Sequence, residues 1–121
     1  MKLSYPAVFY PWDKDEGEGY TVTIPDLPGF TSAGENLAEA ILMAIDGASG
    51  WIRLSLEDGE DIPPASRIED IKPDEEIGSG GFVNWVALDI EAYAEKHGLP
   101  LPVHVKTNPN FLYKRIRAKL S

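Results

Sequence analysis

The spacing of apolar residues predicts three strands before any helix. Leu3–Tyr10 is apolar and aromatic, and Tyr20–Ile24 alternates apolar residues with threonines, so both segments are predicted strands. The polar loop Pro11–Gly19 between them predicts a hairpin. Pro25–Gly29 cannot continue the second strand because its two prolines donate no backbone hydrogen bond, and Phe30–Ala33 is the predicted third strand.

After the third strand, the apolar spacing becomes that of an amphipathic helix. Asn36 followed by Glu39 is typical of a helix start, and residues 57–59, followed by prolines, predict its end. Gly47 and Gly50 weaken a helix, so we expect them where the helix passes close to the sheet, or at a bend. The apolar residues that share one predicted face are Leu37, Ile41, Ala44, Ile45, Ala48, Ile52 and Leu56.

The remaining pattern predicts one more strand and a short helix. A long connection, Ile62–Gly81, leads to a fourth strand at Phe82–Ile90 and a helix at Glu91–His97. The order is therefore βββαβ, and a right-handed crossover through the long helix would place strand four parallel to strand one. We expect a two-layer α/β (α+β) domain with one main helix on a mixed sheet, and Pro6 at a sheet edge or strand start.

Charge divides the 121-residue chain into two parts, a domain at residues 1–98 and a basic tail at 99–121. All 20 acids and six of the 11 Lys/Arg residues fall in the first part, which therefore carries −14. An acidic body suits a basic partner, whereas the tail suits nucleic acid or the body itself; acidity that only maintains solubility is the alternative interpretation. The tail's basic residues are Lys106, Lys114, Arg115, Arg117 and Lys119.

Residues suited to catalysis are few. The chain has no cysteine, and neither a signal segment nor a membrane-spanning run is visible, so we expect a soluble cytoplasmic protein without disulfides. His97 is best interpreted as a surface residue at a helix end, and His104 lies in the tail. Strand one carries no carboxylate of the kind a two-metal nuclease needs, so we expect no enzyme activity, no metal and no cofactor.

Three segments together carry a family resemblance: YPAVFY at strand one, YTVTIPDLPGFTSAGENLAEA through to LEDGEDIPPAS, and VNWVALDIEAYAEKHG near residue 98. Residues 3–98 closely resemble the HicB antitoxin family. The resemblance implies a degraded ribonuclease-H-like fold. It also implies that the chain neutralises, by occlusion, a small basic HicA-type toxin that cleaves mRNA.

The family usually adds a C-terminal DNA-binding module that dimerises and represses its own operon. Here Val103–Lys106 and Phe111–Leu120 could supply one strand and one helix of such a module at most. The resemblance thus implies a homo-oligomer and operator DNA as a second partner, contacted by the tail's basic residues. A nucleic-acid-binding regulator that acts through this tail, or an orphan HicB-like protein, is the alternative reading.

The candidate toxin-facing residues combine exposed acids with an aromatic ring. Pro25, Pro28 and Gly29 should fix Asp26 at a rigid tip, which loses little entropy on binding. Acids of the main helix such as Glu39 offer a competing face, together with Asp46. The predicted partner-binding residues are Asp13, Asp15, Glu16, Glu18, Tyr20 and Asp26.

Overall fold

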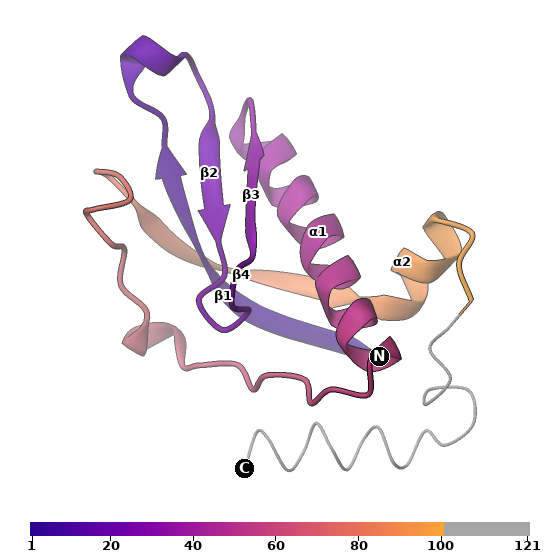
Figure 1. The fold of residues 1–121 in the computed structure, drawn as a ribbon. Coiled ribbons are helices and arrows are strands. Elements are labelled where there is room, and N and C mark those ends of the chain that lie inside the picture. Colours follow the sequence, from indigo (N-terminus) through magenta and orange to yellow (C-terminus); the bar gives the residue numbers. More distant parts are fainter. Residues whose placement is uncertain (101–121) are drawn as a thin grey trace.

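The computed structural model describes residues 1–100 (Figure 1), and the predicted elements and basic residues of the tail lie outside them. Within residues 1–100, the predicted strands and helices form, with boundaries that move by at most a few residues. The elements are β1 (Lys2–Pro11), a 3-10 turn (Lys14–Glu16), β2 (Tyr20–Thr23), β3 (Thr31–Gly34), α1 (Leu37–Glu57), a second 3-10 turn (Ile68–Asp70), β4 (Phe82–Asp89) and α2 (Ile90–Lys96).

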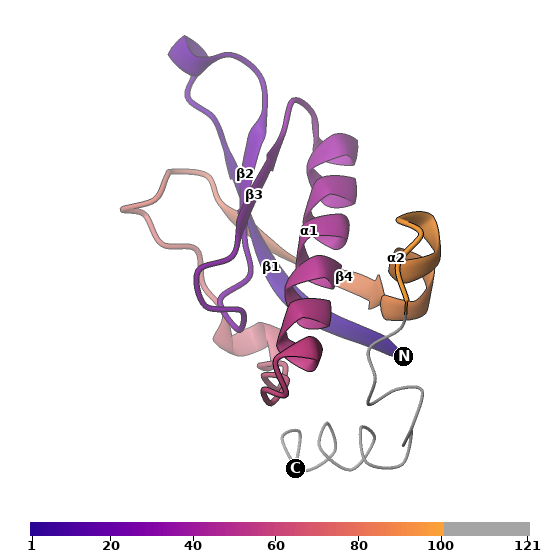
Figure 2. The ribbon, with the colours of Figure 1, turned by 45° about the vertical axis from the view of Figure 1, so that its right-hand side comes forward.

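The four strands form one antiparallel sheet in the order β3-β2-β1-β4. The predicted two-layer α+β architecture is therefore confirmed, with α1 covering one face of the sheet (Figure 2). The predicted parallel pairing of strands one and four is wrong, because Phe82 lies opposite Phe9 and Asp89 opposite Lys2, so the two strands run in opposite directions. The sheet is not mixed.

The connection between α1 and β4 explains this direction. It first passes Tyr5, whose hydroxyl donates to the Pro63 carbonyl oxygen at 2.7 Å, and later passes Tyr10, whose hydroxyl accepts from the Asp74 backbone N–H at 2.9 Å. The connection thus follows β1 from its beginning to its end and crosses the side of the sheet opposite α1 (Figure 2). Because the connection runs along β1 in this way, β4 starts beside the end of β1 and runs back towards its beginning. The pairing is therefore antiparallel.

β1 is consequently covered on both faces, because six consecutive residues from Tyr5 to Tyr10 are buried. Pro6 lies within this central strand rather than at an edge or strand start, so that expectation is wrong. The β1–β2 ladder begins only at Val8, opposite Thr23. The missing N–H of Pro6 therefore removes none of the β1–β2 hydrogen bonds.

α1 begins as predicted, with the Asn36 side chain accepting from the Glu39 backbone N–H at 2.8 Å. Its fully buried apolar residues include four of the seven predicted on one face, together with Ala40. Leu37 is 38% exposed, and Ile41 and Ile45 are only partly buried, so the prediction that Leu37 packs on the sheet is wrong. The residues at the centre of the face are Ala40, Ala44, Ala48, Ile52 and Leu56.

Gly34, rather than the two helix glycines, marks the close approach of sheet and helix. A Cβ at Gly34 would lie 2.3 Å from the Ala40 backbone nitrogen. A Cβ at Gly47 would instead meet the Phe30 ring, and one at Gly50 would meet the Tyr93 hydroxyl of α2. The expectation that Gly47 and Gly50 face the sheet is therefore wrong, because they make room for side chains that flank α1.

Candidate protein-binding surface

The β1–β2 hairpin projects beyond the sheet at the end where α1 begins (Figure 1). Its base is closed by the Trp12 backbone N–H, which donates to the Gly19 carbonyl oxygen at 2.9 Å, and by Trp12 Nε1, which donates to Thr21 Oγ1 at 2.9 Å. The four predicted acids at its tip are all exposed, so they form a compact negative surface, which we call the acidic hairpin: Asp13, Asp15, Glu16 and Glu18.

Tyr20 connects the acidic hairpin to the core. Its ring meets the edge of Phe82 with centroids 6.2 Å apart, and Phe82 stacks on Phe9 at 5.3 Å. Tyr20 is half-buried and packs against the hydrophobic core. The aromatic contacts of Tyr20 therefore anchor the hairpin to the core. They leave only part of the Tyr20 side chain available to a partner.

A groove of about 600 Å³ separates the acidic hairpin from the first turn of α1. Glu18 and Tyr20 line one side, and Glu35 and Leu37 line the other. The β2–β3 register creates this arrangement by placing Gly34 opposite Tyr20, so that the residues after β3 lie beside the hairpin. Sequence reasoning missed Glu35 and Leu37, although an antiparallel register drawn from the predicted meander would have brought them to this groove.

Asp26 lies at the opposite end of β2 and does not join the acidic hairpin. Its carboxylate accepts from the Ser66 backbone N–H at 2.8 Å and from Ser66 Oγ at 2.5 Å, which ties the long connection to the β2–β3 loop. Burial raises the pKa of the Tyr5 hydroxyl, and the negative charge of Asp26 raises it further. The structure thus gives Asp26 a structural contact and separates it from the other predicted acids.

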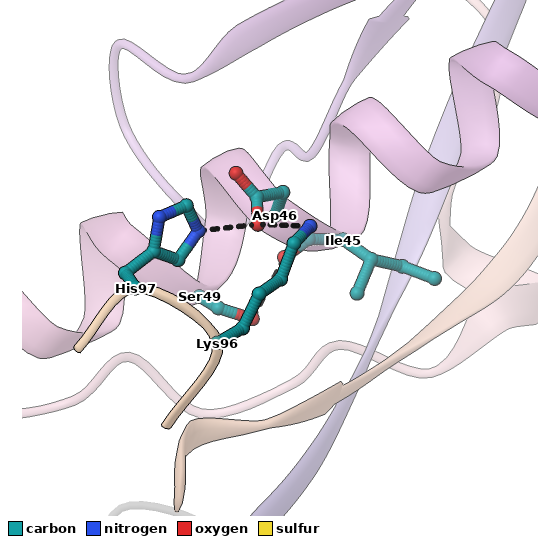
Figure 3. Close-up of polar contacts among 5 residues, drawn as sticks. All are labelled: Ile45, Asp46, Ser49, Lys96 and His97. Carbon is teal, nitrogen blue, oxygen red and sulfur yellow. Dashed lines mark hydrogen bonds and ion pairs between the residues drawn. The ribbon is translucent and has the colours of Figure 1, made fainter. Parts of the chain in front are cut away.

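The competing helix face is partly occupied by α2. Asp46 Oδ1 lies 2.9 Å from His97 Nε2 and 3.2 Å from Lys96 Nζ (Figure 3). The His97 ring also packs on Tyr93. The hydrogen bond from His97, assisted by Lys96, holds the pKa of Asp46 below its ordinary value. Asp46 therefore fastens α2 to α1, whereas Glu39 is exposed in the first turn of α1.

The histidine contact does not resemble a nucleophile–base pair. Ser49 is one turn from Asp46, but its hydroxyl donates to the Ile45 carbonyl oxygen at 2.7 Å (Figure 3). Within residues 1–100, no three His, Asp or Glu side chains gather as a group that could hold a metal ion. Over the same residues, no helix is long and apolar enough to cross a membrane.

Fold and surface together define the class as a small antiparallel α+β domain that displays a projecting acidic hairpin. The chain belongs to the HicB_like antitoxin family of bacterial toxin-antitoxin systems, whose family model matches residues 5–119. The resemblance seen in the sequence is therefore confirmed, and it extends into the tail.

Individual relatives agree with this assignment at different levels. An uncharacterized 14.9 kDa protein from the rep-hol intergenic region of Haemophilus phage HP1 is 46% identical over 52 residues, which span 43% of this chain and 39% of that protein. The crystal structure of the N-terminal domain of Burkholderia pseudomallei antitoxin HicB is 27% identical with a TM-score of 0.58, and the match covers 72% of this chain and 99% of that one. A toxin-antitoxin complex from Streptococcus pneumoniae contains a chain of the same fold, with 22% identity, a TM-score of 0.67 and coverage of 94% and 99%.

Proposed function

We propose that this protein binds a small basic HicA-type toxin in the cytoplasm and neutralises it by covering the surface with which the toxin binds RNA. The observation that carries the proposal is the family match over residues 5–119. A structural neighbour that comes from a toxin-antitoxin complex supports the same kind of partner.

The charge of the domain supports the mechanism. Toxin surfaces that bind RNA present Lys and Arg to phosphates, and an acidic protein competes for those same positive charges. The acidic hairpin concentrates four exposed carboxylates around a single lysine, Lys14, and Glu35 adds a fifth across the groove. We propose this end of the domain as the toxin-facing surface, with binding rather than catalysis as its action.

Co-expression with a small basic protein, where one is encoded beside this gene, tests the proposal. We expect that induction of the neighbour alone arrests growth, that co-induction of this chain restores it, and that the two proteins co-purify. Growth arrest that persists although both proteins are made and folded would contradict the proposal.

A second candidate function uses the basic tail to bind operator DNA. The tail has five Lys/Arg residues and no acid, which favours phosphate contacts. If the tail binds DNA, affinity for an operator fragment should fall steeply with salt, and neutralising Lys114, Arg115 and Arg117 should weaken it. Binding that is unaffected by these changes would remove the tail from the interface.

A further inference from the structure

The outer edge of β4 has no strand partner among residues 1–100, because β4 ends the sheet. It has eight residues, whereas β3 at the other edge has four. Natural proteins protect edge strands by making them short or by placing lysine, proline or a bulge on them, since an unpaired edge pairs readily with another chain. Residues 82–88 contain neither a charge nor a proline. β4 therefore lacks the usual protection.

At the middle of this edge, one backbone donor of β4 is satisfied only by a neighbouring side chain. Trp85 lies opposite Pro6 of β1, and the Trp85 backbone N–H donates to the Asn84 side-chain oxygen at 2.8 Å. Antiparallel ladders alternate, so the backbone groups of Val83 and Ala87 face outward as well. The Asn84 side chain thus accepts a hydrogen bond that the backbone of a neighbouring strand would otherwise accept.

Exposed aromatic side chains accompany this edge. Trp85 is 45% exposed and Phe82 is 38% exposed. Beside Trp85 lies a groove of about 280 Å³ whose wall includes Pro63, Pro64 and Ala65. Exposed tryptophan next to an apolar groove is typical of the centre of a protein–protein interface.

We propose that β4 is a self-association edge, at which a second copy of this chain pairs antiparallel about a two-fold axis at Trp85. This pairing places Val83 opposite Ala87 of the partner subunit and joins the two sheets into one. An interface built on a two-fold axis uses the same surface of both copies, and the uncharged residues 82–88 permit this because no like charges meet there.

Charge favours a second copy over the basic toxin as the occupant. Residues 1–98 carry −14, so two copies repel each other wherever their acids meet, and residues 82–88 are free of charge. A basic toxin would find no counter-charge along this strand, whereas the acidic hairpin supplies one elsewhere. The proposed dimer needs neither the toxin nor a DNA-binding module, so it stands independently of the proposed function.

Measurement of the molar mass of the full chain in solution tests whether it self-associates through β4. We expect light scattering to give twice the 13.3 kDa of one chain, and Trp85→Lys, which sets two like charges opposite each other, to give a single chain. Trp85→Phe should keep the dimer. Ala33→Lys, which adds the same charge to exposed β3 at the other edge, should keep it too.

Amide hydrogen exchange identifies which surface holds the chains together, and it needs no variant that might fail to fold. In the dimer, the Val83, Trp85 and Ala87 amides should be protected, and the protection should fall as dilution separates the chains. A dimer with fast exchange at these amides would overturn the proposal by locating the interface elsewhere. A monomer would also overturn it, whether the amides exchange fast or are covered by the chain's own tail.

Discussion

Gly34 is the residue on which the distance between sheet and helix depends. A Cβ at this position would come within 2.3 Å of the Ala40 nitrogen and 2.6 Å of its Cα, and neither backbone atom can rotate away. β3 and the first turn of α1 would have to separate. We expect Gly34→Ala to lower the free energy of unfolding by about 1–3 kcal/mol, the usual range for overpacking, as measured by urea denaturation.

Gly47→Ala provides the matched control. Its Cβ would meet only the Phe30 ring at 2.9 Å, which can turn aside, and alanine favours a helix over glycine by about 1 kcal/mol. We expect a much smaller loss than for Gly34→Ala. Equal losses would mean that the tight contact at Gly34 is not what limits the approach of α1.

Burial within α1 gives a second prediction at the residue scale. Ile52 is fully buried, and Ile52→Ala should cost about 2–5 kcal/mol through lost contacts and a cavity. Ile45 is only partly buried, so Ile45→Ala should cost less than about 2 kcal/mol. Denaturant unfolding of both variants checks the order, and a larger cost at Ile45 would contradict the packing described for α1.

At the scale of elements, local pattern predicted each strand and helix, but not the direction of the last pairing. Alternation and helical spacing are properties of a segment, so they survive without the rest of the chain. The direction of β4 depends on where the connection attaches, through Tyr5, Ser66 and Tyr10, and these contacts join residues distant in sequence. No spacing rule in the sequence encodes such contacts.

The candidate surface was predictable to a similar degree. The loop composition correctly indicated an exposed acidic hairpin, because charged residues between two strands have nowhere to be buried. Glu35 and Leu37 were missed because they enter the groove through the β2–β3 register. Asp26 was grouped with the acidic hairpin although the length of β2 separates them and Ser66 engages its carboxylate. The tail's basic residues lie outside the described part of the chain, and their role stays a prediction.

The contact between α1 and α2 should respond to acid. The pKa of Asp46 is lower in the folded protein than in the unfolded chain, because His97 and Lys96 bond its charged form. Its contribution is therefore present above about pH 4 and is lost as the pH falls through the folded value. We expect Asp46→Asn to destabilise by about 0.2–1 kcal/mol near neutral pH, as exposed pairs do, and to have no effect in strong acid. A difference that persists in acid would contradict this linkage.

At the scale of the whole molecule, the acidic hairpin and the outer edge of β4 lie on different parts of the domain. The acidic hairpin extends from one end of the sheet, and the uncharged residues 82–88 of β4 form one of its side edges. Reversing Asp13, Asp15, Glu16 and Glu18 to lysine should slow association with a basic toxin, most strongly at low salt, because rim charges act mainly on association rate. Stopped-flow kinetics over a range of salt concentrations measures both the rate and its salt dependence.

A second set of reversals controls for total charge. Asp58, Glu60, Asp70 and Glu95 are exposed and lie outside both the acidic hairpin and the groove beside it, and their reversal changes the net charge equally. We expect a smaller effect on the association rate from this set. If both sets slow binding alike while circular dichroism shows folded protein, net charge rather than the acidic hairpin steers the encounter.

We propose that this protein silences a toxin by covering its RNA-binding surface, and the decisive experiment is to titrate it into an RNA-cleavage reaction of a purified HicA-type toxin. We expect that cleavage falls in proportion to added protein and stops at a fixed stoichiometry, and that RNA and this protein exclude each other from the toxin. Undiminished cleavage in the presence of excess folded protein, or a stable complex in which the toxin still binds RNA, would contradict it.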